Sequence, residues 1–433
     1  MQNVEEMTQS LGRDLYEAVQ RTTPTFGSSY WWKEKAMMWF AGDEEVRTQL
    51  LRFVDVYPVL RSAKDKKVHL QEYLFQGVSH PPFLFKLGGA MCRFDPTAGL
   101  VMAVADLGIR IMAKYFVVGP KPAEVSRAIA GLQKEGASYT LDVLGEAVLS
   151  DAEADKHMEK YIGFVEQLAA LGCKPINLSV KLSGLCAQFD PLNIKSCNQA
   201  RDRLRKILRV AKAKGASVTI DAEQYAYRTL VLNIFKDTFN EEEFRDFENA
   251  GIAMHTYFLD SEEKIRDIIQ WARARKTPIL MRLVKGAYWD WEVIAAKQKG
   301  TAIPVFAEKW QTDVSYERCT ELVLENSDVV HLAVASHNYR TIAQAMAKSR
   351  AMGVPTDRLE FQVLMGMGDP LKKAIPRLGF PVCVYVPSGD VVPGMSYLVR
   401  RIIENTSQTG FLFLSIGAGL TIDKLMAIPQ AAG

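Results

Sequence analysis

The sequence feature that most constrains the fold is a series of eight short apolar runs between residues 139 and 389. The runs are residues 139–145, 176–184, 217–223, 251–257, 278–286, 329–338, 359–367 and 381–389. Segments with apolar residues at three- and four-residue steps separate them, and another such segment follows the last run. Eight consecutive strand–helix units predict a (β/α)8, or TIM-type, barrel.

A doubly wound sheet is the alternative that the same alternation leaves open. The sequence has no G-x-G-x-x-G turn and no P-loop to support nucleotide binding by such a sheet. We therefore predict an α/β chain with two parts: an N-terminal helical arm and α-domain at residues 1–130, and the barrel at 131–425. Within the first part we expect a charged loop at residues 61–67.

Residues 98–119 form the longest apolar stretch and could be read as a membrane span. Asp106, Arg110 and Lys114 recur in it at steps of four, which places one polar stripe along a helix. This pattern favours a mostly buried amphipathic helix.

Composition excludes several classes of protein. The net charge of +3 over 433 residues comes without basic runs interleaved with aromatic residues, so we expect no nucleic-acid partner. The six cysteines form no C-x-x-C pair, and the histidines form neither H-x-H nor H-E-x-x-H, so we expect no metal site. The acidic start "MQNVEEMTQS" does not resemble a signal peptide, which favours a cytoplasmic protein.

Polar residues close almost every apolar run, at the strand ends where barrel enzymes gather their reactive groups. These residues are Asp142 and Glu146, Lys181, Asp221 and Glu223, His255, Arg282 and Lys285, His337 and Asn338, Gln362, and Tyr385. Several follow apolar runs in which only a compensated charge is tolerated, which indicates an active site. A Schiff-base aldolase that uses Lys181 or Lys285 stays open as an alternative, as does a scaffold with a degenerate barrel.

The segment "YLVRRIIENT" adds a second cluster of polar groups. Tyr397, Arg400, Arg401 and Glu404 fall on one face of a helix. Two neighbouring arginines can bind a carboxylate through paired hydrogen bonds.

Together "RLVKGAYWDWE", "DAEQYAYR", "FQVLMGMG" and "YLVRRIIENTSQTGF" resemble the proline dehydrogenase family, in particular the proline dehydrogenase half of bifunctional proline utilization A (PutA) proteins. The resemblance runs from the first predicted strand to about Phe411, and the N-terminal helices resemble the arm and helical domain of PutA. It implies an FAD-dependent enzyme that oxidises L-proline to Δ1-pyrroline-5-carboxylate by hydride transfer to flavin N5.

The resemblance also implies a role for each matching position around the flavin. Arg282 would lie near flavin N5, the loop Lys285, Gly286 and Ala287 would meet the cofactor, and Trp289 would pack near its adenine end. Further flavin contacts are implied for Ala222, His255, Ser336, His337, Gln362 and Leu364.

A second group of positions is implied for the substrate. Lys181, Arg400 and Arg401 match the cations that bind the proline carboxylate, and Asp221 matches an aspartate that orients Lys181 and the substrate. Tyr385, Tyr397 and Leu364 would shape the pocket. Glu146 resembles a gate carboxylate that pairs with one of the two arginines, and Glu404 would hold an arginine from the other side.

Two positions depart from the family pattern. His255 stands where relatives usually have glutamine, and Ala307 stands where they have threonine. A histidine can titrate near neutral pH, so the flavin potential could differ. The implied partners are a membrane quinone, reached by peripheral association with the membrane, and the aldehyde dehydrogenase domain of a longer parent chain.

Overall fold

The structure of the chain is a computed structural model. It describes residues 4–22, 62–76, 114–145, 148–390 and 421–430, together with scattered positions between 45 and 60 and at 103 and 107. Four predicted site residues lie outside this part of the chain: Glu146, Tyr397, Arg400 and Arg401. Glu404 and most of the 98–119 segment lie outside it as well.

Eight parallel strands form a closed barrel in sequence order, and β1 pairs with β8 to close it. The strands are β1 Ser138–Val143, β2 Asn177–Val180, β3 Ser217–Ile220, β4 Ala250–His255, β5 Ile279–Val284, β6 Val330–Ala335, β7 Leu359–Leu364 and β8 Val382–Ser388. Each falls within or beside one of the eight predicted apolar runs. The (β/α)8 prediction is confirmed, and the doubly wound sheet is excluded because an open sheet would leave β1 and β8 unpaired.

The two faces of each strand have different chemistry. On β5, Met281 and Leu283 belong to the hydrophobic core between sheet and helices, whereas Arg282 between them points into the barrel. Its side chain reaches Thr140 of β1 and Asp221 after β3, which is possible only across the barrel interior. Period-two alternation therefore gives an apolar outer face and a polar inner face.

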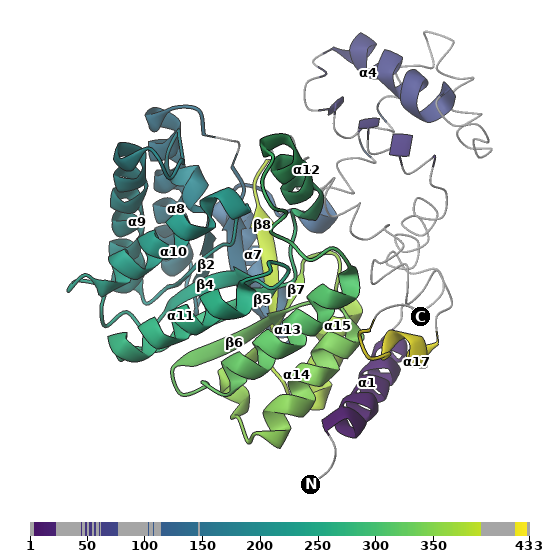
Figure 1. Cartoon of the computed structure of the whole chain (residues 1–433). Coiled ribbons are helices and arrows are strands. Elements are labelled where there is room, and N and C mark those ends of the chain that lie inside the picture. The colour runs from purple at the N-terminus through teal and green to yellow at the C-terminus, as the bar shows by residue number, and fades with distance from the viewer. Residues whose placement is uncertain are drawn as a thin grey trace.

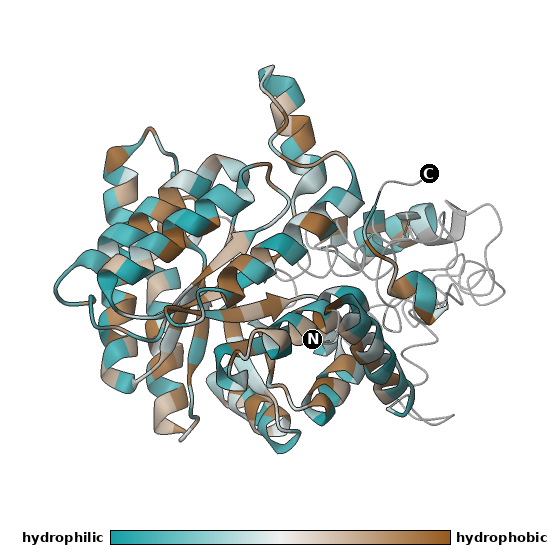
Figure 2. Ribbon diagram, turned by 60° about the horizontal axis from the view of Figure 1, so that its bottom comes forward, coloured by the Kyte–Doolittle hydropathy of each residue, from teal (hydrophilic) through white to brown (hydrophobic). Residues whose placement is uncertain are grey.

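Helices surround the barrel (Figure 1). They are α7 Pro122–Lys134, α8 Asp151–Ala170, α9 Ile194–Lys214, α10 Tyr225–Asn240, α11 Ser261–Arg275, α12 Trp289–Lys299, α13 Lys309–Leu324, α14 Tyr339–Ala351 and α15 Asp369–Ala374. Short 3-10 turns lie at η3 Leu182–Leu185, η4 Thr356–Arg358 and η5 Ile375–Leu378. Figure 2 shows these helices banded in brown and teal, as expected for helices with one face on the sheet and one in water.

The charged loop predicted at residues 61–67 is wrong. Helix α4 runs from Ala63 to Leu70, and a π-helical turn, η2, continues it over Gln71–Gln76. The Ser62 side chain accepts a hydrogen bond from the backbone N–H of Asp65, and the Asp65 carboxylate lies in the first turn. This N-cap and first-turn charge start a helix despite the density of charged residues.

Both ends of the described chain pack on the barrel. Helix α1, Val4–Gln20, packs mainly on α14 and α15, and the short C-terminal helix α17, Ile422–Leu425, lies beside it (Figure 1). Helix α7 spans residue 131 and packs on β1 and α8, so the domain boundary at 131 stays a prediction. Within the described residues, no helix is both long and apolar enough to cross a membrane.

Candidate active site

The candidate site is built around Arg282 at the carboxyl-terminal end of the barrel. Only 3% of the Arg282 side chain is exposed. It donates to Asp221 Oδ1 at 2.6 Å, to Ser179 Oγ at 2.9 Å and to Gln362 Oε1 at 2.6 Å. The Arg282 guanidinium also lies 5.3 Å from the centre of the Tyr385 ring. Five donors in a rigid fork allow one arginine to join side chains from several strands.

Lys181 lies directly after β2 and forms the second cation of the network. Its Nζ lies 2.6 Å from Asp142 Oδ1, 3.1 Å from Asp221 Oδ2 and 3.3 Å from the Tyr385 hydroxyl. Burial disfavours the charge, but the nearby Asp142, Tyr385 and Asp221 outweigh it and raise the pKa of Lys181 well above its usual value. About a third of the Lys181 side chain is exposed.

Asp221 connects the two cations. Burial raises the pKa of its carboxyl, but the charges of Lys181 and Arg282 and the hydrogen bond from Tyr385 lower it to about 2. The Tyr385 hydroxyl donates to Asp221 Oδ2 at 2.7 Å. Burial, Asp142 and Asp221 raise the pKa of Tyr385 well above its usual value, so the phenol stays protonated. Asp221 is therefore a permanent carboxylate at neutral pH and a poor proton acceptor.

Gln362 supports Arg282 from β7. Its Oε1 accepts from Arg282 Nε, and its Nε2 donates to Glu360 Oε1 at 2.6 Å. Burial raises the pKa of Glu360. The pair of hydrogen bonds fixes the Gln362 amide with its oxygen towards the guanidinium.

His255 ends β4 and is 7% exposed. Its ring lies 5.0 Å from the Tyr257 ring and 5.4 Å from the Phe258 ring, and it has no hydrogen bond to another described residue. Burial and the charge of Arg228 lower its pKa to about 3. We expected that His255 could titrate near neutral pH; in this environment it stays neutral there. Ala222 and His255 line a small cavity beside β3 and β4.

The loop after β5 carries four predicted cofactor contacts. Lys285 Nζ binds Asp313 of α13 at 2.5 Å. Gly286 has φ +157° and lies against the Tyr257 ring, where a Cβ would come within 2.3 Å of it. Ala287 is exposed, and Trp289 starts α12 with 41% of its surface exposed. The Trp289 Nε1 donates to the Phe306 carbonyl at 2.8 Å.

The loop after β6 brings Ser336 and His337 beside the end of β7. Ser336 Oγ accepts from the backbone N–H of Asn338 at 3.1 Å. His337 Nε2 accepts from the backbone N–H of Leu364 at 3.0 Å, which fixes Nε2 as the acceptor. Ser336, His337 and Leu364 are all half-buried.

The predicted residues within the described chain thus form two groups at one end of the barrel. Asp221, Arg282, Lys181, Gln362 and Tyr385 are in one hydrogen-bonded network. The others lie around it, at strand ends, on loops or at the start of α12, and are partly accessible or line the cavity. They are Ala222, His255, Lys285, Gly286, Ala287, Trp289, Ser336, His337 and Leu364.

Four network residues and Asp313, the partner of Lys285, were not predicted to have these roles. Asp142 was recognised only as a strand end, and Thr140, Ser179, Glu360 and Asp313 were not considered. The sequence contains a pattern that could have identified three of them. Thr140, Ser179 and Glu360 each stand two residues before another polar residue, and therefore on the same face of a strand. Nothing in the sequence points to Asp313, whose partner is on another element.

The arrangement offers fixed positive charge in a largely dehydrated environment. Arg282 is buried, Lys181 is partly exposed, and the carboxylates of Asp142 and Asp221 bind the two cations. Such a site can bind an anion at its accessible end and stabilise negative charge that develops on a group above Arg282. Asp221, whose pKa is lowered, is not a general base at neutral pH.

Family models match almost the whole chain. A model described as proline dehydrogenase matches residues 125–413, and one described as proline utilization A N-terminal domain matches residues 5–116. The first covers more than half of the chain and includes the entire barrel.

Curated relatives and solved structures agree with these matches. Bifunctional protein PutA of Escherichia coli (strain K12) is 30% identical over 354 residues, which are 77% of this chain and 26% of that protein. Proline dehydrogenase 1 of Bacillus subtilis (strain 168) is 29% identical over 309 residues, 71% of this chain and 92% of that protein. A crystal structure of PutA from Bdellovibrio bacteriovorus has a TM-score of 0.88 and 33% identity, and covers 99% of this chain and 44% of that one. The chain thus spans about a quarter of the length of the curated PutA relatives that it matches.

Proposed function

Because the chain belongs to the proline dehydrogenase family, we propose that it oxidises L-proline to Δ1-pyrroline-5-carboxylate with FAD as its cofactor. The observation that supports this most directly is the pair of cations at the carboxyl end of the barrel. Lys181 is partly exposed and charged, as binding of an amino-acid carboxylate requires, and Arg282, which shares the Asp221 carboxylate with it, is buried.

The residues around the network fit a flavin. His255 is a buried neutral imidazole whose ring nitrogens make no hydrogen bond within the described chain, so they are available to a bound polar ring. Lys285, Gly286 and Ala287, in the loop after β5, and Ser336, in the loop after β6, lie at the same end of the barrel. When bound, FAD would accept at N5 the hydride that leaves the ring carbon beside the proline nitrogen.

Each network residue has a distinct proposed task. Arg282 would supply positive charge to a bound flavin, and Gln362 and Asp221 hold its guanidinium in one orientation. Asp221 also holds Lys181, so it orients groups and does not accept a proton. A preorganised cation lowers the cost of negative charge that develops during the reaction.

The substrate would lie between Lys181 and the segment that carries Arg400 and Arg401. We propose that Arg400 and Arg401 bind the proline carboxylate together with Lys181, and that Tyr385, Tyr397 and Leu364 enclose the ring. Glu146 would close the site by pairing with one arginine, which would exclude water and strengthen the ion pairs.

A Schiff-base aldolase remains the second candidate because of one observation. A nucleophilic lysine must be neutral, and burial lowers the pKa of Lys285 despite the Asp313 carboxylate. Lys181 does not share this property, since its pKa is raised. Trapping of a carbonyl substrate on Lys285 by borohydride would favour the aldolase.

The remaining parts of the proposal concern the whole protein. We propose a membrane quinone as electron acceptor, reached by peripheral membrane association of a cytoplasmic enzyme. We also propose that the helical part at 1–130 and the barrel at 131–425 belong to a longer PutA chain with an aldehyde dehydrogenase domain.

The absorption spectrum of the purified chain tests the central proposal. The FAD-reconstituted protein should show flavin bands that bleach when L-proline is added under anaerobic conditions, and an artificial quinone should restore them. A chain that binds no FAD, or a flavin that stays oxidised with L-proline, would contradict it.

A further inference from the structure

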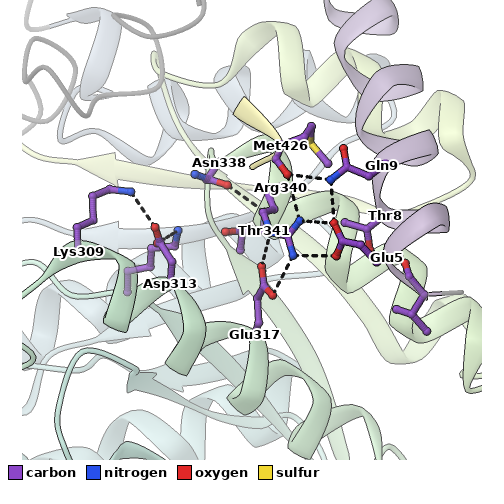
Figure 3. A network of polar contacts seen from close by, with 12 residues as sticks. Glu5, Thr8, Gln9, Lys309, Asp313, Glu317, Asn338, Arg340, Thr341 and Met426 are labelled. Atoms are coloured by element: carbon purple, nitrogen blue, oxygen red, sulfur yellow. Dashed lines mark hydrogen bonds and ion pairs between the residues drawn. The ribbon is translucent and has the colours of Figure 1, made fainter. Parts of the chain in front are cut away.

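Arg340, on the first turn of α14, joins three elements outside the candidate site (Figure 3). Its Nη1 and Nη2 donate to the two carboxylate oxygens of Glu5, in α1, at 2.8 and 3.0 Å. Its Nε and Nη2 donate to Glu317, in α13, at 2.8 and 3.3 Å, and Nη1 donates to the Met426 carbonyl at 3.1 Å. All five N–H donors are used. We call Arg340, Glu5, Glu317 and the Met426 carbonyl the Arg340 clamp.

The Arg340 clamp contains one buried guanidinium and two partly buried carboxylates. The side chain of Arg340 is 6% exposed, that of Glu317 is 20% exposed and that of Glu5 is 33% exposed. Burial raises the pKa of Glu317 despite Arg340, whereas the hydrogen bond from Arg340 lowers the pKa of Glu5. Two carboxylates share one guanidinium, so loss of Glu5 leaves a balanced Arg340–Glu317 pair. Glu5 can therefore be changed without stranding a buried charge.

The two barrel helices of the clamp also hold the candidate site. One turn before Glu317 on α13, Asp313 binds Lys285 of the loop after β5. Asp313 is bound from its other side by Lys309 at 2.9 Å (Figure 3). The position of α13 therefore sets the position of Lys285.

Helix α14 has the same relation to the loop after β6. Asn338, two residues before Arg340, caps the helix by accepting from the backbone N–H of Thr341 at 2.9 Å. Its own N–H is bound by Ser336, and His337 between them binds the backbone of Leu364. A shift of the first turn of α14 would move Ser336 and His337 with it.

We propose that Arg340 is a positioning residue: α1, through Glu5, locks the α13–α14 pair and thereby fixes Lys285 and His337 at the cofactor side of the site. This inference rests on the proposed function for its catalytic consequence, but the mechanical coupling stands on the contacts alone. Helix α1 then helps to position residues of the candidate site, although Glu5 lies more than 300 residues from Arg340 in the sequence.

Hydrogen exchange of the full chain, measured without and with FAD, tests the coupling. In Glu5→Gln we expect amide exchange to increase about three- to tenfold in the segments 283–288 and 336–342. The Kd for FAD should increase by a similar factor, whereas the KM for L-proline should not change. Glu5→Asp keeps the charge and should restore part of the wild-type exchange. Glu17→Gln is the matched control, because it removes an exposed ion pair from the same helix.

Two results would overturn the proposal: wild-type exchange in both segments of Glu5→Gln, or an equal increase over α8 and α9, which would indicate general loosening. If exchange changes as expected but neither protein binds FAD, the coupling stands and the proposed function fails.

Discussion

Asp221 is bound by groups from three other strands, and its charge decides how these groups are arranged. It accepts from Lys181, Arg282 and Tyr385, which belong to β2, β5 and β8 or follow them directly. Without the carboxylate, the buried guanidinium of Arg282 would lose the one carboxylate that binds it among the described residues. The ionised state of Asp221 is therefore a structural requirement of the network.

We predict that Asp221→Asn lowers the free energy of unfolding by roughly 3–5 kcal/mol at pH 7, because it leaves Arg282 buried with its charge uncompensated. The folded-state pKa of Asp221 is about 2, below the unfolded value of about 3.9. Its stabilisation is therefore present above pH 4 and is lost as the pH falls towards 2. Urea unfolding at pH 7, 5 and 3 should show the difference between the proteins shrinking at low pH.

Asp237→Asn is the control for this experiment, because Asp237 forms only an exposed pair with Arg201. Its unfolding curve should match that of the wild type at each pH. A difference between Asp221→Asn and wild type that stays constant down to pH 3 would contradict the assigned role of the Asp221 charge.

For His255 we predict no titration in the physiological range. Burial lowers its pKa to about 3, so the imidazole is neutral from pH 5 to 8. His255→Gln should therefore leave the shape of the pH–rate profile between pH 6 and 8 unchanged, while the visible flavin spectrum shifts. If the substitution removes an ionisation near pH 6.5, the histidine is solvated in the working enzyme and this prediction is wrong.

Residue types at strand ends could be predicted from the sequence, but their partners could not. Lys181, Asp221 and Arg282 stand out because a charge inside an apolar run needs compensation. Ser179 and Thr140 do not, because hydroxyl residues are ordinary in strands. Asp313 lies on a helix, where nothing in the sequence shows which of its neighbours in space will be a lysine.

The loop between β5 and α12 depends on a glycine. Gly286 has φ +157°, and a Cβ there would approach the Tyr257 ring to 2.3 Å. We predict that Gly286→Ala costs about 1–3 kcal/mol of stability and weakens FAD binding, since the loop carrying Lys285 must shift. Thermal unfolding and FAD titration measure the two effects.

Gly131→Ala is the matched substitution for this loop. Gly131 lies inside helix α7, and a Cβ there would meet nothing within 4 Å. It should stabilise the chain by about 0.5–1 kcal/mol and leave FAD binding unchanged. If the two variants had the same stability and the same affinity for FAD, the conformation of Gly286 would not be required for either property.

Secondary-structure elements were predictable to different degrees. The strands could be recognised because their outer faces are apolar throughout and their inner faces are only sparsely charged. Helix α4 was missed because Lys64, Asp65, Lys66 and Lys67 gave it no apolar stripe, and the Ser62 N-cap was overlooked. Pattern methods identify elements that bury one face, and α4 has almost no such face.

The chain brings its two ends together on one side of the barrel. Gln9 of α1 donates to the Met426 carbonyl at 3.0 Å, across 417 positions. The Met426 side chain is completely buried, and a Cβ on Gly12 would come within 2.2 Å of it. The glycine therefore makes room on α1 for this methionine. Such long-range packing could not be predicted from the sequence, because neither segment contains a sequence motif that identifies its packing partner.

This packing predicts that α1 and the C-terminal segment unfold together. Met426→Ala removes a buried side chain that fills the space at Gly12, and should cost about 2–4 kcal/mol in urea unfolding. Amides of Leu11 and Leu15 should exchange faster in the variant, because α1 loses part of its contact with the rest of the molecule. Ile428→Ala, two residues further on and 54% exposed, should change stability by less than about 0.5 kcal/mol. Slow exchange in α1 of Met426→Ala would instead show that α14 alone holds the helix.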